Sequence, residues 1–255
     1  MQPPDVTIAV PALNEERRIG GTLQGLLEVA RQVPGRRLEI LAVDDGSTDR
    51  TAAIIGDLAR EHPEIRLLQN PRNLGLGASI RRAITEARGG RFMIVPGDND
   101  LAPATLATLL RQAHAADLVM CYFPDRQARG AGRRLLSALF GRIYAAGFGV
   151  RVQYLNGPCV YPVDRLRALE LFSTRFSIVA EINVKLLRQG LSFVEIPGHR
   201  QTGLAGSTSL SLRNLREVAA VFLRLFAEVH FRRRALYRRR PVRVSLPQGP
   251  GAEKE

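Results

Sequence analysis

Residues 91–100 read RFMIVPGDND and combine a strand signal with two closely spaced carboxylates. Four apolar residues, 92–95, run into a Pro-Gly turn that is followed by Asp98 and Asp100. A short apolar run closed by a breaker is typical of a buried parallel strand, and ligands bind at the carboxyl ends of such strands. Carboxylates at i and i+2 of an extended segment share a face, so both can reach one divalent cation.

A cation held by Asp98 and Asp100 neutralises charge on a diphosphate as it leaves, so the stretch predicts a site for a nucleotide diphosphate. The same residues can also form only a solvated turn. On this stretch alone, both interpretations stay open.

Strands and helices are expected to alternate on both sides of this stretch. Apolar and β-branched runs predict strands at residues 6–10, 38–43, 65–68, 91–95, 118–123, 160–162 and 193–196. Segments with helical spacing of apolar residues separate most of them, which predicts an α/β fold with a mostly parallel sheet flanked by helices. Asn14 is expected to cap the first helix, with Glu15 and Glu16 in its first turn.

A dinucleotide-binding Rossmann domain would place a glycine-rich turn directly after the first strand. Here that turn reads PALNEE, at residues 11–16, and contains no glycine. The later pair Gly75 and Gly77 lacks the third glycine, because position 80 is Ile. The sequence therefore disfavours a dinucleotide site.

Charge is distributed unevenly along the 255 residues. The formal net charge is +13, and the segment from Arg200 to the C-terminus holds 12 Arg or Lys against four Glu. Such a segment can meet nucleic acid, an anionic membrane surface or only water. No nucleic-acid motif accompanies the charge, so we expect no nucleic-acid partner.

The cysteines and the hydropathy pattern suggest where the protein works. Cys121 and Cys159 show neither metal spacing nor a disulfide framework, which favours a reducing cytoplasm. No uncharged apolar stretch of about 18 residues occurs, so we expect no membrane span.

Residues 210–231 predict one helix with a single apolar face, formed by Leu215, Val218, Phe222, Leu225 and Val229. Two Arg triplets, at 232–234 and 238–240, follow it. An amphipathic helix beside clustered Arg is typical of peripheral membrane association, although the same face can pack on the protein.

A wide apolar helix after Leu135 leaves the same choice between lipid and core open. The expected organisation is a main domain at residues 1–208, an amphipathic basic helix at 209–240 and a disordered tail at 241–255.

Four segments, taken in order, resemble a known family. They are VPALNEE at 10–16, VDDGSTD at 43–49, NLGLGAS at 73–79 and DND at 98–100. Their order and spacing are similar to those of family 2 glycosyltransferases with the GT-A fold. Within that family, the chain most resembles the dolichyl- or polyprenyl-phosphate sugar synthases.

The resemblance implies roles for individual residues. It places the sugar nucleotide at Pro11, Ala12, Leu13, Asn14, Glu15, Asp44, Asp45, Asp98 and Asn99. It makes Asp98 and Asp100 the ligands of Mg²⁺ or Mn²⁺, with Asp100 also catalytic. Glu181 is the candidate general base if one is needed, although it can equally be an ordinary acid of a helix's first turns.

The acceptor is predicted with less help from the family. Arg133, Arg134 and Arg200 are candidates for holding an acceptor phosphate, because the Arg fork matches phosphate oxygens. The acidic residue of a later motif of these synthases is replaced by Gln153. A phosphate acceptor is already ionised near neutral pH, so it tolerates that loss.

These observations predict a metal-dependent, inverting glycosyltransferase that moves a sugar from a UDP- or GDP-sugar to a polyprenyl phosphate. It is expected to lie on the cytoplasmic face of the plasma membrane as a peripheral protein. The alternative is a soluble or glycolipid hydroxyl acceptor with Glu181 as base, and a distant alternative is a nucleic-acid-binding protein that uses the Arg-rich tail.

Overall fold

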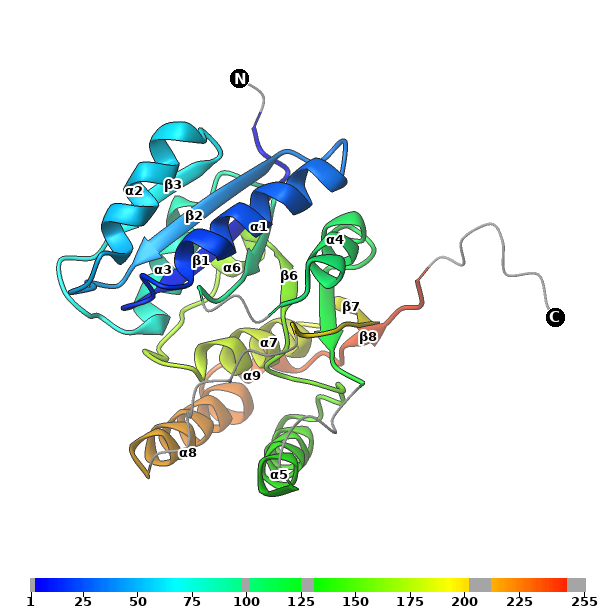
Figure 1. The fold of residues 1–255 in the computed structure, drawn as a ribbon. Coiled ribbons are helices and arrows are strands. Elements are labelled where there is room, and N and C mark those ends of the chain that lie inside the picture. Colours follow the sequence, from blue (N-terminus) through cyan, green and yellow to red (C-terminus); the bar gives the residue numbers. More distant parts are fainter. Residues whose placement is uncertain (1–2, 98–100, 125–130, 202–211, 247–255) are drawn as a thin grey trace, which may run out of the picture.

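The structure, a computed structural model, describes residues 3–97, 101–124, 131–201 and 212–246, without the side chains of 131–137 and 212–215. These residues form one eight-stranded sheet with the strand order β3-β2-β1-β4-β6-β5-β7-β8. Helices cover both faces of this sheet (Figure 1).

The strands are β1 (Val6–Ala12), β2 (Leu38–Asp44), β3 (Ile65–Gln69), β4 (Arg91–Ile94), β5 (Leu118–Tyr122), β6 (Cys159–Pro162), β7 (Ser192–Pro197) and β8 (Val242–Arg243). The helices before residue 200 are α1 (Ile19–Gln32), α2 (Thr51–Glu61), α3 (Leu76–Glu86), α4 (Pro103–Arg111), α5 (Ala131–Phe148), α6 (Val163–Arg167) and α7 (Ile178–Arg188). After residue 200 come α8 (Leu212–Ala227), the π-helix η1 (Glu228–Arg232) and α9 (Arg234–Tyr237).

The strands pair in parallel except around β6, which runs antiparallel to both β4 and β5. The prediction of a mostly parallel sheet is therefore confirmed. Alternate residues of the central strands serve two separate cores: Ile8 and Ile40 meet α1, α2 and α4, whereas Ala9 and Leu41 meet α3 and α7. Apolar burial on both faces explains why these strands read as continuous apolar runs.

The apolar face of α8 packs on the protein. Leu225 and Val229 are buried, and the Phe222 ring lies 5.2 Å from the ring centroids of both Tyr144 and Phe148 of α5. Of the two interpretations of this apolar face, packing on lipid or on the protein, the structure shows packing on the protein for Phe222, Leu225 and Val229. No helix among the described residues is both long and apolar enough to cross a bilayer.

Two expectations about chain ends differ from the structure. The first helix begins at Ile19, and neither Asn14 nor an acidic residue lies in its first turn. Within the tail predicted as disordered from residue 241, Val242–Arg243 instead form β8, since the amides of Val242 and Val244 donate to the carbonyls of Leu191 and Phe193, and residues 247–255 lie outside the described residues. Backbone pairing with a sheet edge is available to any extended segment and leaves little trace in composition.

Candidate active site

Strands β1, β2 and β4 end side by side, and the chain that leaves each strand is fastened to its neighbour. The amide of Asp45 donates to the carbonyl of Ala12 at 2.9 Å, and the amide of Gly97 donates to that of Pro11 at 3.2 Å. We call this region, the ends of β1, β2 and β4 with the loops after them, the carboxyl edge. It brings together two of the predicted nucleotide-binding segments, and in an open α/β sheet it is where ligands bind.

The chain approaches the predicted metal ligands along this edge. The hydroxyl of Thr22 in α1 donates to the carbonyl of Gly97 at 2.9 Å and so fixes the residue that precedes Asp98. Asp98, Asn99 and Asp100 lie outside the described residues, so their roles toward metal and diphosphate stay predictions. Carboxylate oxygens are the hard donors that Mg²⁺ and Mn²⁺ prefer, so the residue types fit the ion.

Asp44 ends β2 with a carboxylate that is only half engaged by protein. The residue is fully buried, and its Oδ1 accepts a hydrogen bond from the amide of Ser47 at 3.2 Å. Within the part of the chain that the structure describes, its buried Oδ2 has no hydrogen-bond partner. A buried oxygen without a partner is costly, so this atom is well suited to receive a donor group of a bound ligand.

The carboxylate of Asp45 instead accepts hydrogen bonds from a neighbouring loop. Its Oδ1 accepts from the side-chain amide of Asn70 at 2.8 Å and from the amide of Leu74 at 3.0 Å, and its Oδ2 accepts from the amide of Gly75 at 2.8 Å. Asp45 therefore shapes the segment that leads into α3. Direct contact with a nucleotide stays a prediction for this residue.

Asn14 connects the loops after β1 and β2. Its amide donates to Ser47 Oγ at 2.9 Å, and its Oδ1 accepts from the amide of Thr48 at 2.9 Å. The residue has a φ of +55°, in the left-handed region that Asn tolerates better than most residues. Asn14 and Leu13 are exposed at the rim of the carboxyl edge, where a ligand can reach them.

The start of α3 is braced by a segment from the other half of the chain. The amide of Gly77 donates to the carbonyl of Thr174 at 2.9 Å, and a Cβ at Gly77 would lie 2.2 Å from the carbonyl oxygen of Ser173. Only glycine permits this approach. Gly77 of the segment 73–79 thus has a packing role that the sequence did not disclose.

A small apolar pocket of about 130 Å³ lies beside the carboxyl edge. We call it the Arg200 pocket; its lining residues are Ile94, Pro96, Leu101, Phe123, Asn156, Gly157, Pro158, Cys159, Tyr161, Val179 and Arg200. The Arg200 guanidinium lies 4.4 Å from the centroid of the Phe123 ring, a cation–π distance. Among these lining residues there is one cationic side chain and no carboxylate.

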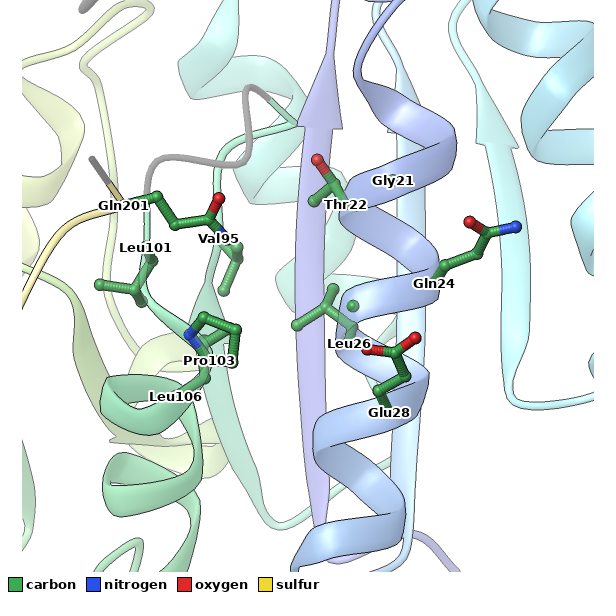
Figure 2. A pocket seen from close by; sticks show the side chains of 11 residues that line it. Gly21, Thr22, Gln24, Leu26, Glu28, Val95, Leu101, Pro103, Leu106 and Gln201 are labelled. Atoms are coloured by element: carbon green, nitrogen blue, oxygen red, sulfur yellow. The ribbon is translucent and has the colours of Figure 1, made fainter. Parts of the chain in front are cut away.

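A second cavity, a groove of about 220 Å³, lies between α1 and α4 (Figure 2). Thr22 and Leu26 of α1 form one wall, and Val95, Pro103 and Gln201 belong to the other. Leu101 lines this groove and also the Arg200 pocket, so the two cavities adjoin at the residue that follows Asp100.

Glu181 does not reach either cavity. It is fully buried, lies 2.8 Å from the ammonium of Lys185, and accepts hydrogen bonds from the amides of Phe172 and Ser173. The residue of α7 that lines the Arg200 pocket is Val179, an aliphatic side chain. These contacts argue against Glu181 as a general base. The side chains of Arg133 and Arg134 lie outside the described residues, so only Arg200 of the three predicted Arg is placed.

Burial disfavours the thiolate form of both cysteines. Burial raises the pKa of Cys121 to about 11 and raises the pKa of Cys159 still further. Both cysteines are free and buried, and Cys159 lines the Arg200 pocket. A thiol with a raised pKa stays protonated near neutral pH and contributes an apolar surface to the pocket.

The mostly parallel sheet and its acidic carboxyl edge are typical of the GT-A fold. The architecture is similar to that of glucosyl-3-phosphoglycerate synthase from Mycobacterium tuberculosis, with a TM-score of 0.61, 21% identity, and coverage of 88% of this chain and 78% of that one. It is also similar to mannosyl-3-phosphoglycerate synthase from Rubrobacter xylanophilus, with a TM-score of 0.65, 20% identity, and coverage of 98% and 79%. The M. tuberculosis enzyme was solved with Mn²⁺, UDP and phosphoglyceric acid, and also with Mg²⁺ and UDP.

The chain belongs to glycosyl transferase family 2, whose model matches residues 7–175. It is 40% identical over 96 residues to a dolichyl-phosphate beta-glucosyltransferase of Trichomonas vaginalis, a match that covers 36% of this chain and 28% of the relative. It is 34% identical over 123 residues to an uncharacterized protein of M. tuberculosis, covering 48% of this chain and 37% of the relative. The chain thus spans well under half the length of these relatives.

Proposed function

We propose that this protein transfers a sugar from a UDP- or GDP-sugar to a polyprenyl phosphate. The observation that carries this proposal is the Arg200 pocket, with its apolar lining, its single guanidinium and no carboxylate among its lining residues. A polyprenyl phosphate presents an apolar chain and an anionic head, and this combination suits such a pocket. The dolichyl-phosphate enzymes among the relatives support the same class of acceptor.

The carboxyl edge would hold the donor. The unpartnered Oδ2 of Asp44 would accept a hydrogen bond from the nucleoside, and the rim residues Leu13 and Asn14 would border it. Asp98 and Asp100 would hold Mg²⁺ or Mn²⁺, and a bound ion would supply positive charge to the donor diphosphate.

In the transfer, an oxygen of the acceptor phosphate forms a bond to the anomeric carbon of the sugar. The bond between that carbon and the nucleotide diphosphate breaks, and the diphosphate leaves with the electron pair, which inverts the configuration. An ionised phosphate needs no general base. The aliphatic Val179 in the pocket and the occupied carboxylate of Glu181 are compatible with this acceptor.

The test is an assay of UDP- and GDP-sugars with Mn²⁺, with and without farnesyl phosphate as a short polyprenyl phosphate. We expect sugar transfer that requires farnesyl phosphate and a glycosylated lipid among the products. Donor hydrolysis that farnesyl phosphate leaves unchanged would contradict the proposed acceptor. It would favour the hydroxyl acceptor, which is the second enzyme predicted from the sequence.

Replacing Arg200 with Gln is expected to raise the KM for farnesyl phosphate by about tenfold or more, since a charge-assisted hydrogen bond to a phosphate contributes about 1.5–3 kcal/mol. The measurement is steady-state transfer at saturating nucleotide sugar. Arg60→Gln is the matched control, because Arg60 pairs with the exposed Asp57 of its own helix. Equal effects of the two variants would refute the role of Arg200.

We also propose that the C-terminal helices rest on the cytoplasmic face of a membrane. Leu223, Phe231 and Leu236 are 66%, 73% and 54% exposed in a segment that also carries the exposed Arg232 and Arg234. Exposed large apolar side chains interleaved with Arg are typical of proteins that bind anionic lipid surfaces. This surface is separate from the buried face of α8.

The double variant Leu223→Ser, Phe231→Ser is expected to bind anionic vesicles roughly tenfold more weakly, because both side chains lose apolar area that would enter the lipid. The measurement is co-sedimentation with phosphatidylglycerol vesicles. Val242→Ser, which changes a 53% exposed residue at the sheet edge, is the control. Unchanged binding of the double variant would place the lipid contact elsewhere.

A further inference from the structure

The segment that carries Arg200 returns to the exit of the predicted metal loop. Leu101 and Arg200 form an antiparallel bridge, and the amide of Ala102 donates to the carbonyl of His199 at 3.2 Å. Leu101 directly follows Asp100 in the sequence. The predicted acceptor residue and the predicted metal loop are therefore joined through backbone pairing.

One side chain reinforces this junction. Thr105, which is 4% exposed in the first turn of α4, accepts a hydrogen bond from the amide of His199 at 2.8 Å. Its hydroxyl donates to the carbonyl of the same residue at 3.1 Å. Thr105 thus engages both backbone polar groups of His199, in the way that a neighbouring strand would.

The geometry of Thr105 differs from that of an ordinary helical threonine. A threonine inside a helix commonly donates to the carbonyl four residues before it, as Thr108 does to Ala104 at 2.9 Å. Thr105 instead directs its hydroxyl out of its own helix, to a residue 94 positions later. Its branched side chain has few rotamers, so the position of the hydroxyl is set by α4.

The chain before His199 is confined from the other side. The amide of Gly198 donates to the carbonyl of Tyr122 at 2.8 Å. A Cβ at Gly198 would lie 2.4 Å from Cys121 Sγ and 2.6 Å from Thr105 Cγ2. The segment at Gly198 is therefore held between β5 and α4. Two residues later, the side chain of Arg200 lines the Arg200 pocket.

We propose that Thr105 is a positioning residue for the acceptor, whose hydroxyl holds His199 and thereby sets Arg200 against the Arg200 pocket. This inference rests on the proposed function, because it takes the pocket to be the site of the acceptor phosphate. Thr105 is not among the residues that line either cavity, so it would act through His199 and Arg200. A shift of about 1 Å at a substrate-positioning group is enough to slow a transfer reaction strongly.

The experiment compares full-length Thr105→Val, which is nearly isosteric but lacks the hydroxyl, with Thr108→Val on the same helix. For Thr105→Val we expect the KM and the dissociation constant of farnesyl phosphate to rise about tenfold, with the KM of the nucleotide sugar changed less than about twofold. Hydrogen exchange of the His199 amide should become about tenfold faster. Thr105→Ser, which keeps the hydroxyl, should restore most of the acceptor affinity.

The outcomes separate this inference from the proposed function. Farnesyl phosphate that binds in a Thr105-dependent way but receives no sugar would refute the proposed function and support the inference. Transfer to farnesyl phosphate that Thr105→Val leaves intact would refute the inference alone, as would equal effects of Thr105→Val and Thr108→Val. A wild-type protein that does not bind farnesyl phosphate would refute both.

Discussion

Replacing Lys185 with Met is expected to lower the free energy of unfolding by about 3–5 kcal/mol, because it leaves buried carboxylates without their counter-charge. The Lys185 ammonium lies 2.8 Å from Glu181 and 3.0 Å from Glu228, and it also donates to the carbonyl of Glu170. Lys185 and Glu181 are fully buried. The ion pair between Lys185 and Glu228 joins α7 to η1, because Glu228 points inward from that π-helix.

The measurement is urea unfolding followed by far-ultraviolet circular dichroism, since the chain has no Trp. Arg60→Met, which breaks an exposed ion pair with Asp57, is the matched control. We expect that control to change the stability by less than about 1 kcal/mol. A Lys185→Met variant as stable as the control would show that the buried charges do not need each other.

Replacing Asp100 with Ala is expected to lower metal-dependent turnover of the nucleotide sugar by about 1,000-fold or more and to leave the fold intact. Removing one of two carboxylates from a divalent-cation site weakens binding of the ion that stabilises the leaving diphosphate. The measurement is transfer at saturating Mn²⁺ together with calorimetric titration of Mn²⁺ in the presence of UDP.

Asp57→Ala, which removes an exposed carboxylate of α2, is the control for Asp100→Ala. Turnover and Mn²⁺ binding of the control should match the wild type. Normal activity of Asp100→Ala would refute the assignment of residues 98–100 as the metal site.

The sheet could be predicted from the sequence because its central strands β1 and β2 are buried on both faces. Apolar runs such as 92–95 and 38–43 carry the same signal whatever surrounds them, since burial alone selects their residue types. The seven predicted strands are all present, and the loops that leave β1 and β2 lie at one edge because these parallel strands end together. The grouping of these two loops was therefore predictable without knowing the strand order.

Contacts between side chains that lie far apart in the sequence could not be predicted from it. The capping role predicted for Asn14 used only its neighbours, whereas in the structure its Oδ1 accepts from Thr48, 34 positions later. For Glu181 the spacing to Lys185 suggests an i,i+4 pair, but the amides of Phe172 and Ser173 come from a loop packed beside α7. Those contacts bury the carboxylate that the sequence offered as a base.

The packing of α8 could not be decided in advance either. One apolar face of a helix is the same pattern whether lipid or protein covers it. The rings of Tyr144 and Phe148, which meet Phe222, belong to α5, and only the folded chain brings them together. Exposure of Leu223 and Phe231 on the remaining surface is likewise a property of the fold.

In the proposed function, the order of elements along the chain separates the donor site from the acceptor site. Residues up to Gly97 build the carboxyl edge, whereas the largest group of residues that line the Arg200 pocket comes from 156–161, with Phe123 and Arg200 beside them. Under that proposal, substitutions in the later part of the chain would alter acceptor choice and leave the donor chemistry unchanged. A lineage built on this plan can diversify its products by drift in one half of a gene.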